Sequence, residues 1–214
     1  MSYLPEFLAV ALIHLLAVIS PGPDFAVIIR QSLRYGRSIA IATAIGIGLG
    51  LSVHIIYSLL GVSALLHTLP WLLTVAKVVG GLYLLYLGVL FIKSQPKQAL
   101  SLTQNQQEPA TNGYKAFGLG FLTNATNPKA TLFFLSLFTT IINPHTPLLI
   151  QAAYGLWMVI ITALWFSLVS IIFTHSKIRQ KFLAIAHWIE RVTGAILLIL
   201  ASLLIISVFI PESL

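Results

Sequence analysis

Apolar residues dominate the chain in long runs, and polar residues interrupt these runs only at intervals. Six runs have about 20 residues or more, the length that a helix needs to cross the hydrocarbon core of a bilayer. They cover residues 5–34, 38–66, 70–92, 114–142, 147–173 and 184–209. Short connections separate most of them, and one longer polar segment, 93–113, lies between the third and the fourth. The pattern predicts an all-α integral membrane protein with six transmembrane helices.

The first and the fourth runs each contain a proline that is followed at once by an ionisable residue. The two pairs are Pro23-Asp24 and Pro128-Lys129. Proline removes a backbone donor and breaks a helix, and in hydrocarbon such a break survives only inside protein or beside a cavity. A charge at the bilayer centre costs a further ~2.5–3.5 kcal/mol. Because the chain combines both penalties twice, with opposite charges, we expect a binding site at the two broken helices.

Composition supports a membrane protein and changes how the charge is interpreted. Hydrophobic residues make up 58% of the chain and charged residues 8%, and the mean hydropathy is +0.96. A net charge of +7 would suggest a nucleic-acid partner in a soluble protein, but here the basic residues gather in connecting loops, so no nucleic acid is expected. The absence of cysteine excludes disulfides and thiolate metal sites. The amino terminus lacks the basic region of a signal peptide, so we expect the first run to be retained.

Basic residues follow an alternating pattern along the connections. They are Arg30, Arg34 and Arg37 around the first connection, Lys93, Lys97 and Lys115 around the third, and Lys177, Arg179 and Lys181 in the fifth. The second and fourth connections and both termini contain none. The positive-inside rule therefore predicts a cell (inner) membrane protein with odd-numbered connections in the cytoplasm and both termini outside. Lys77, Lys129 and Arg191 remain, and all three lie within predicted spans.

The two halves of the chain resemble one another. Pro23-Asp24 aligns with Pro128-Lys129, and the later segment 77–80, a lysine followed by Val-Val-Gly, aligns with 191–194, an arginine followed by Val-Thr-Gly. Each half contains three spans, so the second half must enter the membrane from the opposite face. Inverted repeats with broken helices in corresponding positions are typical of secondary transporters. We predict one membrane domain made of a three-helix repeat at 1–92, a polar cytoplasmic linker at 93–113 and an inverted repeat at 114–214.

Several segments, in order along nearly the whole chain, carry a family resemblance. They are residues 20–25 (Ser-Pro-Gly-Pro-Asp-Phe), Gly36 with the glycines of 46–50, residues 77–88, residues 124–130 (Asn-x-x-Asn-Pro-Lys-Ala) and residues 190–194. In these segments the chain resembles the LysE/RhtB amino-acid exporters. Many members carry a Pro-Gln-Phe turn after the Asn-Pro-Lys segment, and residues 136–140 lack it. The chain is most similar to the threonine and homoserine export branch. The resemblance implies export of a small neutral or hydroxylated amino acid, by proton antiport.

Asp24 and Lys129 are the central candidates for a substrate site. A pseudo-two-fold axis in the membrane plane would bring equivalent residues of the first and fourth helices together. One acid and one base there would complement the α-ammonium and α-carboxylate of an amino acid, with Asp24 also the candidate for coupling to protons. The alternative is a permanent Asp24–Lys129 ion pair that holds the bundle together. The two interpretations are compatible if the pair opens when substrate enters.

Other polar and small residues surround the two breaks or lie elsewhere in the spans. The remaining substrate-site candidates are Gly22, Pro23, Asn124, Asn127 and Pro128. The short polar side chains either cap freed backbone groups or contact substrate, and Asn127 is the best candidate for contact. Lys77 and Arg191 either reach toward the membrane surface or line the transport pathway. Glu190 is a candidate coupling residue, a local ion-pair partner or a rim residue.

Two other functions fit the sequence less well than amino-acid export. Cation efflux would need several oxygen ligands, whereas Asp24 is the only acidic residue deep within the spans, Glu190 lies near the end of one, and Lys129 would repel a cation. A membrane-embedded enzyme would need a nucleophile–base pair or a metal cluster, and the histidines are scattered. No catalytic residue, metal site or cofactor is therefore predicted. The expected partners are an amino acid, protons and the lipid bilayer, and a homodimer stays open as an alternative to a monomer. Without a nucleotide-binding loop, the energy must come from a gradient.

Overall fold

A computed structural model describes residues 3–68, 70–95, 111–143, 145–173 and 175–209. In these ranges every regular element is an α-helix, so the predicted all-α class is confirmed. The elements are α1 (Leu4–Ile19), α2 (Pro23–Tyr35), α3 (Arg37–Thr68), α4 (Pro70–Ile92), α5 (Gly113–Ala125), α6 (Pro128–Thr140), α7 (Leu148–Ile172) and α8 (Ser176–Phe209).

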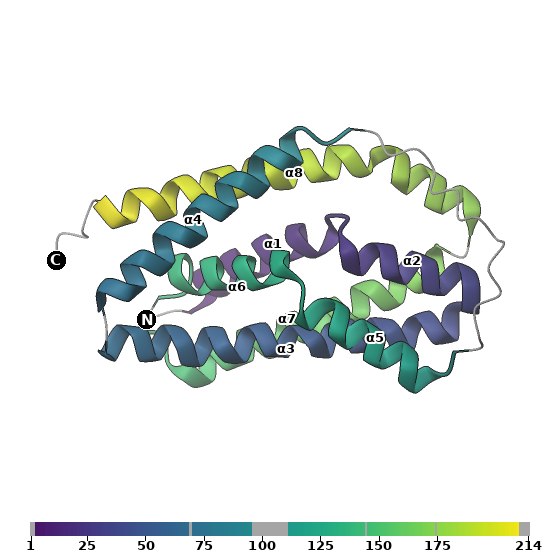
Figure 1. The fold of residues 1–214 in the computed structure, drawn as a ribbon, viewed down its shortest axis with the longest axis horizontal. Coiled ribbons are helices and arrows are strands. Elements are labelled where there is room, and N and C mark those ends of the chain that lie inside the picture. Colours follow the sequence, from purple (N-terminus) through teal and green to yellow (C-terminus); the bar gives the residue numbers. More distant parts are fainter. Residues whose placement is uncertain (1–2, 69, 96–110, 144, 174, 210–214) are drawn as a thin grey trace.

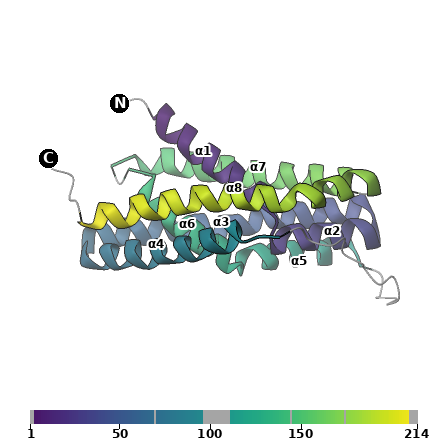
Figure 2. The ribbon, with the colours of Figure 1, turned by 90° about the horizontal axis from the view of Figure 1, so that it is seen from above.

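The helices form an elongated bundle (Figure 1). Helices α4 and α8 pack together along one edge, and α3 packs against both α5 and α7 along the other. Helices α1, α2 and α6 lie between these two groups. Seen from above, α1 tilts away from the axis that the long helices share, toward the amino terminus (Figure 2).

Length and apolarity single out the segments that could cross a bilayer. Among the described residues, Arg37–Gly61, Leu148–Ile172 and Lys177–Ile206 qualify as single helices. The pair α1–α2 qualifies as one span bent by 53°. The 25 residues of α7 reach about 37 Å, which exceeds the roughly 30 Å hydrocarbon thickness. The structure thus contains three, or with the bent pair four, of the predicted spans as candidates. Helix α4 contributes a shorter apolar stretch, Lys77–Ile92.

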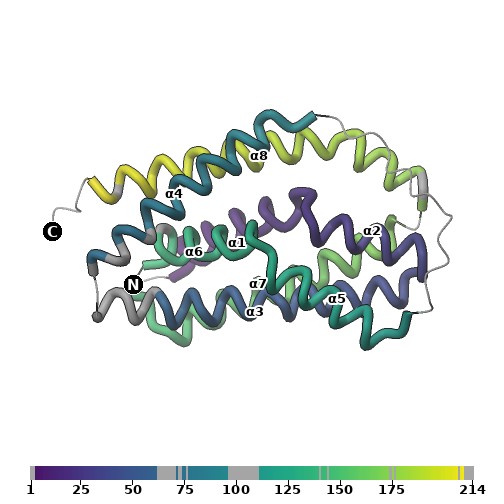
Figure 3. Tube along the Cα trace, in the orientation of Figure 1, coloured from purple at the N-terminus to yellow at the C-terminus, as the bar shows by residue number. Residues whose placement is uncertain are grey.

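Both proline motifs break a helix where the sequence predicts a break. Pro23 begins α2 after the extended residue Gly22, and Pro128 begins α6 after Asn127. Proline is favoured in the first helical turn, because the N–H that it lacks would have no partner there. The trace in Figure 3 shows the two chain breaks near the middle of the bundle.

The start of α8 differs from the sequence prediction. The apolar run was predicted to begin at 184 after a connection that included 175–181, whereas the helix begins at Ser176. Hydropathy marks only the apolar part of a helix, and the intervening Lys177, Arg179 and Lys181 are good helix formers that extend it. The predicted linker 93–113 lies mostly outside the described residues, and α5 begins at its end with Asn112 as the cap.

Glycines let α3 approach its neighbours closely, as their spacing predicts. A Cβ on Gly50 would lie 2.6 Å from the backbone oxygen of Phe121 in α5. A Cβ on Gly48, on another face of α3, would lie 2.7 Å from the Cβ of Ala163 in α7. The position of α5 against α3 fixes where the second break lies in the bundle.

Candidate substrate site

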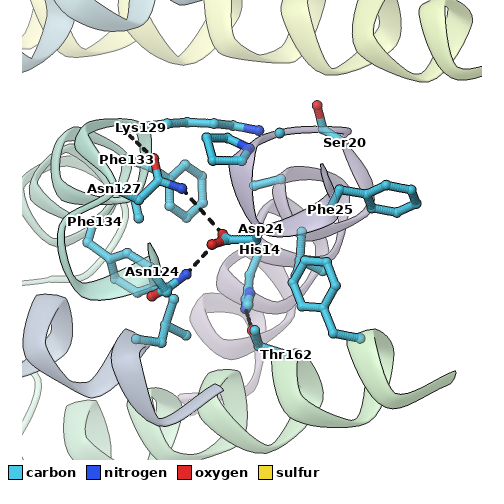
Figure 4. Close-up of a pocket in the computed structure, with 17 residues that line it drawn as sticks. His14, Ser20, Asp24, Phe25, Asn124, Asn127, Lys129, Phe133, Phe134 and Thr162 are labelled. Carbon is cyan, nitrogen blue, oxygen red and sulfur yellow. Dashed lines mark hydrogen bonds between the residues drawn. The ribbon is translucent and has the colours of Figure 1, made fainter. Parts of the chain in front are cut away.

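A cavity lies where the two helix breaks meet (Figure 4). It has about 60 Å³ of space for the centres of water-sized molecules. A single water needs roughly 10–15 Å³ by that measure, so the cavity accommodates several waters or part of a small solute. Its walls come from α1, α2, α5, α6 and α7, with Leu51 from α3. Six of the seven predicted substrate-site residues line it: Gly22, Pro23, Asp24, Asn124, Asn127 and Lys129. Pro128 does not line it.

Two side-chain amides from the second break converge on Asp24 in the first (Figure 4). Asn124 Nδ2 donates to Asp24 Oδ2 at 3.0 Å, and Asn127 Nδ2 donates to the same oxygen at 3.3 Å. The other carboxylate oxygen, Oδ1, is buried and has no hydrogen-bond partner among the described residues. The carboxylate is therefore held in place on one side and keeps acceptor capacity on the other.

Asn127 performs both functions that the sequence left open. Its Oδ1 accepts from the Lys129 backbone N–H at 3.0 Å and so caps α6, while its Nδ2 binds Asp24 in the cavity wall. Asn124 lies in the last turn of α5 and does not act as a cap. Thr126 caps only, because its Oγ1 donates back to Leu122 O at 2.7 Å and its side chain is exposed.

Lys129 lies in the first turn of α6, two residues after Asn127, and its side chain extends toward the first break (Figure 4). Its Nζ is 4.9 Å from the centroid of the Phe91 ring, a cation–π distance, and would be 3.6 Å from a Cβ placed on Gly22. Its positive charge also acts on the Asp24 carboxylate. A negative and a positive side chain thus line one cavity, as the sequence predicts for these two residues.

A pair of residues in α3 supports the second break from behind the cavity. Pro128 has no N–H, so Asn124 O loses its normal helical donor. His54 Nε2 bonds that carbonyl at 2.8 Å, while His54 Nδ1 bonds Tyr57 Oη at 2.9 Å. Tyr57 in turn donates to Thr131 O at 3.2 Å, so α3 contacts the backbone on both sides of the break. His54 and Tyr57 thus join α3 to α5 and α6 by hydrogen bonds.

A hydrogen-bonded pair of polar residues also lines the cavity, and the sequence does not single out either of them. His14 in α1 and Thr162 in α7 line the cavity and are joined through His14 Nε2 and Thr162 Oγ1 at 3.1 Å. Both are almost fully buried. A lone polar residue inside an apolar run is the only signal that the sequence gives for either of them.

Unpartnered polar atoms concentrate around this cavity. Four of its lining residues have a buried side-chain atom without a hydrogen-bond partner in the part of the chain described: His14 Nδ1, Ser20 Oγ, Asp24 Oδ1 and Asn124 Oδ1. Buried polar groups normally have partners, and each exception needs a reason such as water, an ion or a ligand. These atoms are mainly acceptors, and a ligand with donor hydrogens would satisfy them.

The three predicted pathway residues lie elsewhere and do not line the cavity. Glu190 is buried and accepts from Ser94 Oγ, so it is not the exposed rim residue that the sequence allowed. Arg191 Nε donates to Ser94 O at 3.1 Å, and its guanidinium carbon lies 5.0 Å from the Trp188 ring centroid. These contacts join the end of α4 to α8. Lys77 is half-buried in α4.

Apolar helices of bilayer length around a polar cavity at two helix breaks characterise a polytopic membrane protein with an internal polar site. Comparison with known proteins gives the family. The model of the LysE type translocator family matches residues 15–208, and the chain belongs to this family. It is therefore a membrane transporter and not an enzyme.

Similar proteins match this chain over nearly its full length. The threonine efflux protein of Escherichia coli (strain K12) is 34% identical over 193 residues, 89% of this chain and 92% of that protein. The threonine efflux protein of Salmonella typhi is 32% identical over the same shares. The uncharacterized membrane protein YahN of Escherichia coli (strain K12) is 27% identical over 186 residues, 87% of this chain and 82% of that protein. No solved structure shows a significant match.

Proposed function

We propose that this transporter exports a small neutral or hydroxylated amino acid, of the threonine or homoserine type, in exchange for protons. The observation that carries the proposal is the presence of Asp24 and Lys129, from two broken helices, at one cavity whose lining includes acceptor atoms without a partner among the described residues. Family membership and the similarity to threonine efflux proteins support it.

The cavity suggests how a zwitterion would be held. The α-ammonium has three donors, and Asp24 Oδ1 and Asn124 Oδ1 are acceptors that no described residue occupies. The α-carboxylate would bind Lys129, in a charge-assisted hydrogen bond. The amino ends of α2 and α6, which begin at the two breaks, add favourable partial charge for an anion.

Exchange of substrate for protons would follow if the proton and the substrate bind to the same carboxylate. Asp24 is the acid that lines the cavity, so a proton and the substrate ammonium compete for it. While substrate is bound, its carboxylate would draw the positive charge of Lys129 away from Asp24, which favours protonation of Asp24 and thereby release of the ammonium. In this scheme Lys77, Glu190 and Arg191 are candidates for the pathway outside the cavity.

We also propose the six-span inverted-repeat arrangement in the inner membrane, with both termini outside the cytoplasm. In that arrangement α4 corresponds to α8 and α3 to α7, and these helices pack against each other in pairs. Pairing of equivalent helices is what a two-fold axis in the membrane plane would produce. The basic residues of alternate connections support the orientation.

Replacing Lys129 with Met tests the carboxylate contact. Methionine keeps most of the side-chain length and removes the charge, so threonine should bind at least about tenfold more weakly, the value of one charge-assisted hydrogen bond. Competition by threonine amide, which has no carboxylate, should change much less. The measurement is competition against labelled threonine efflux in proteoliposomes. An equal loss for the acid and the amide would contradict this assignment.

Two histidines at opposite ends of α7 test the orientation. His145 and His175 are both exposed, in the fourth and fifth connections, and the chain has no native cysteine. In right-side-out membrane vesicles an impermeant maleimide should label His145→Cys. It should label His175→Cys only after the membrane is permeabilised. Labelling of both from the same side would remove α7 as a span and the inverted repeat with it.

A further inference from the structure

The cavity contains a second polar group apart from the residues that bind the charged ends of the substrate. His14 and Thr162 are 2% and 1% exposed, and they come from helices far apart in sequence, α1 and α7. In Figure 4 Lys129 lies on one side of Asp24, and the His14–Thr162 pair lies on the other. Both members line the same cavity as Asp24.

Packing holds the imidazole in a fixed orientation. Its ring meets Phe134 edge-on at 6.3 Å between centroids and Trp157 edge-on at 5.9 Å. Thr162 Oγ1 bonds Nε2 at 3.1 Å. The other ring nitrogen, Nδ1, has no hydrogen-bond partner among the described residues although it is buried. A fixed, buried and unsatisfied nitrogen in a cavity wall costs free energy unless a ligand or water completes it.

The chemistry of the pair restricts what can complete it. If Thr162 donates to Nε2, a neutral His14 carries its proton on Nδ1 and offers a donor. If Nε2 donates to Thr162, Nδ1 is an acceptor. A hydroxyl both donates and accepts, so it satisfies Nδ1 in either tautomer. The aromatic residues of the lining, including Phe133, Phe134 and Phe166, offer no such group and suit a methyl or methylene.

We propose that His14 and Thr162 form the subsite that recognises the side-chain hydroxyl of the substrate. This inference rests on the proposed function, in which Asp24 and Lys129 hold the α-ammonium and α-carboxylate. His14 contacts the hydroxyl, and Thr162 positions His14 by fixing its ring. Discrimination between threonine and valine, which have the same shape, then depends on this pair.

The test compares labelled threonine and labelled valine efflux from proteoliposomes that contain the full chain. The wild type should prefer threonine by about tenfold, the value of one buried hydrogen bond. Thr162→Val and His14→Phe should lower that preference to within about twofold of unity while valine efflux is kept or rises. Thr162→Ser retains the hydroxyl and should restore the preference. Thr43→Val is the matched control. Thr43 is fully buried in α3, its hydroxyl donates to Ile39 O of the same helix and to no other described residue, and it does not line the cavity.

The outcomes separate this inference from the function on which it rests. A wild-type threonine/valine ratio in both Thr162→Val and His14→Phe would overturn the hydroxyl subsite and leave the exporter intact. An equal loss of threonine and valine efflux in both, with Thr162→Ser also inactive, would overturn it in favour of a structural role for the pair. Absence of efflux of either amino acid by the wild type would instead overturn the proposed function, and this subsite with it.

Discussion

A protein with Asp24 replaced by Asn is expected to insert normally and to export threonine at least about tenfold more slowly than the wild type. The reduction follows from the loss of a charge-assisted hydrogen bond to the substrate ammonium, for which the net contribution is roughly 1.5–3 kcal/mol. The residual flux should no longer depend on the proton gradient. A neutral amide does not titrate, so it cannot exchange a proton for the ammonium.

The geometry of the site explains why this substitution should spare the fold. Asn124 and Asn127 both donate to Oδ2 of Asp24, and the oxygen of an asparagine at this position can accept both bonds. The amide nitrogen then occupies the place of Oδ1, which has no hydrogen-bond partner in the described part of the chain. The amide N–H would thus replace a carboxylate oxygen that can accept, and it would face the substrate ammonium, which is also a donor. Substrate binding is weakened while the contact between the two breaks remains.

Efflux of labelled threonine from proteoliposomes at two imposed pH gradients measures both effects. Glu6→Gln is the matched control, because Glu6 also lies in the bent α1–α2 pair and its carboxylate accepts from Thr146 Oγ1 at 3.0 Å, outside the cavity. That variant should keep both the rate and the response to the gradient. A wild-type rate and a wild-type gradient response in Asp24→Asn would refute the coupling scheme.

The helix breaks and the residues beside them could be predicted because they violate local rules. A proline and a charge inside an apolar run are both costly, and only a special environment explains them together. The sequence therefore identifies Asp24, Asn127 and Lys129 as residues at one site. It does not show which carboxylate oxygen of Asp24 accepts hydrogen bonds, since that depends on side-chain amides about 100 positions away in the chain.

His14 and Thr162 could not be found in the same way. Each is a single neutral polar residue in a long apolar run, a pattern that a bundle hydrogen bond explains equally well. Their meeting depends on the 53° bend between α1 and α2 and on the packing of α1 against α7. These are relations between distant segments, which periodicity along one helix does not encode. The start of α8 is missed for a different reason, because helix propensity continues where hydropathy ends.

The second large effect is expected in the fold rather than in the site, from Gly120→Ala in α5. Gly120 faces Thr43 of α3, and a Cβ at this position would overlap the backbone oxygen of Thr43 and lie 3.1 Å from Ile47 N. The approach is reciprocal, since a Cβ on Gly46 would overlap the backbone oxygen of Phe117. Backbone atoms on both sides cannot rotate away as a side chain can. The two helices must separate, and small residues are what hold such helices together in a membrane.

We expect the cost to reach or exceed the roughly 1–3 kcal/mol typical of overpacked cores. For a chain of this length, each kcal/mol corresponds to about 2–4 °C in melting midpoint. Gly118→Ala is the matched control, two residues away in the same helix, because a Cβ there meets no atom within 4 Å. Thermal unfolding in detergent should show a clear drop for Gly120→Ala and none for Gly118→Ala, since alanine favours a helix over glycine.

Separation of α3 from α5 should also disturb the substrate site. Asn124, in the last turn of α5, donates to Asp24, and its backbone oxygen is bonded by His54 of α3. Gly120→Ala is therefore expected to lose threonine efflux even at temperatures where the protein remains folded. Gly118→Ala should transport like the wild type. Equal melting midpoints and equal efflux in the two variants would show that α3 and α5 are not packed as closely in the membrane as the glycine contacts require.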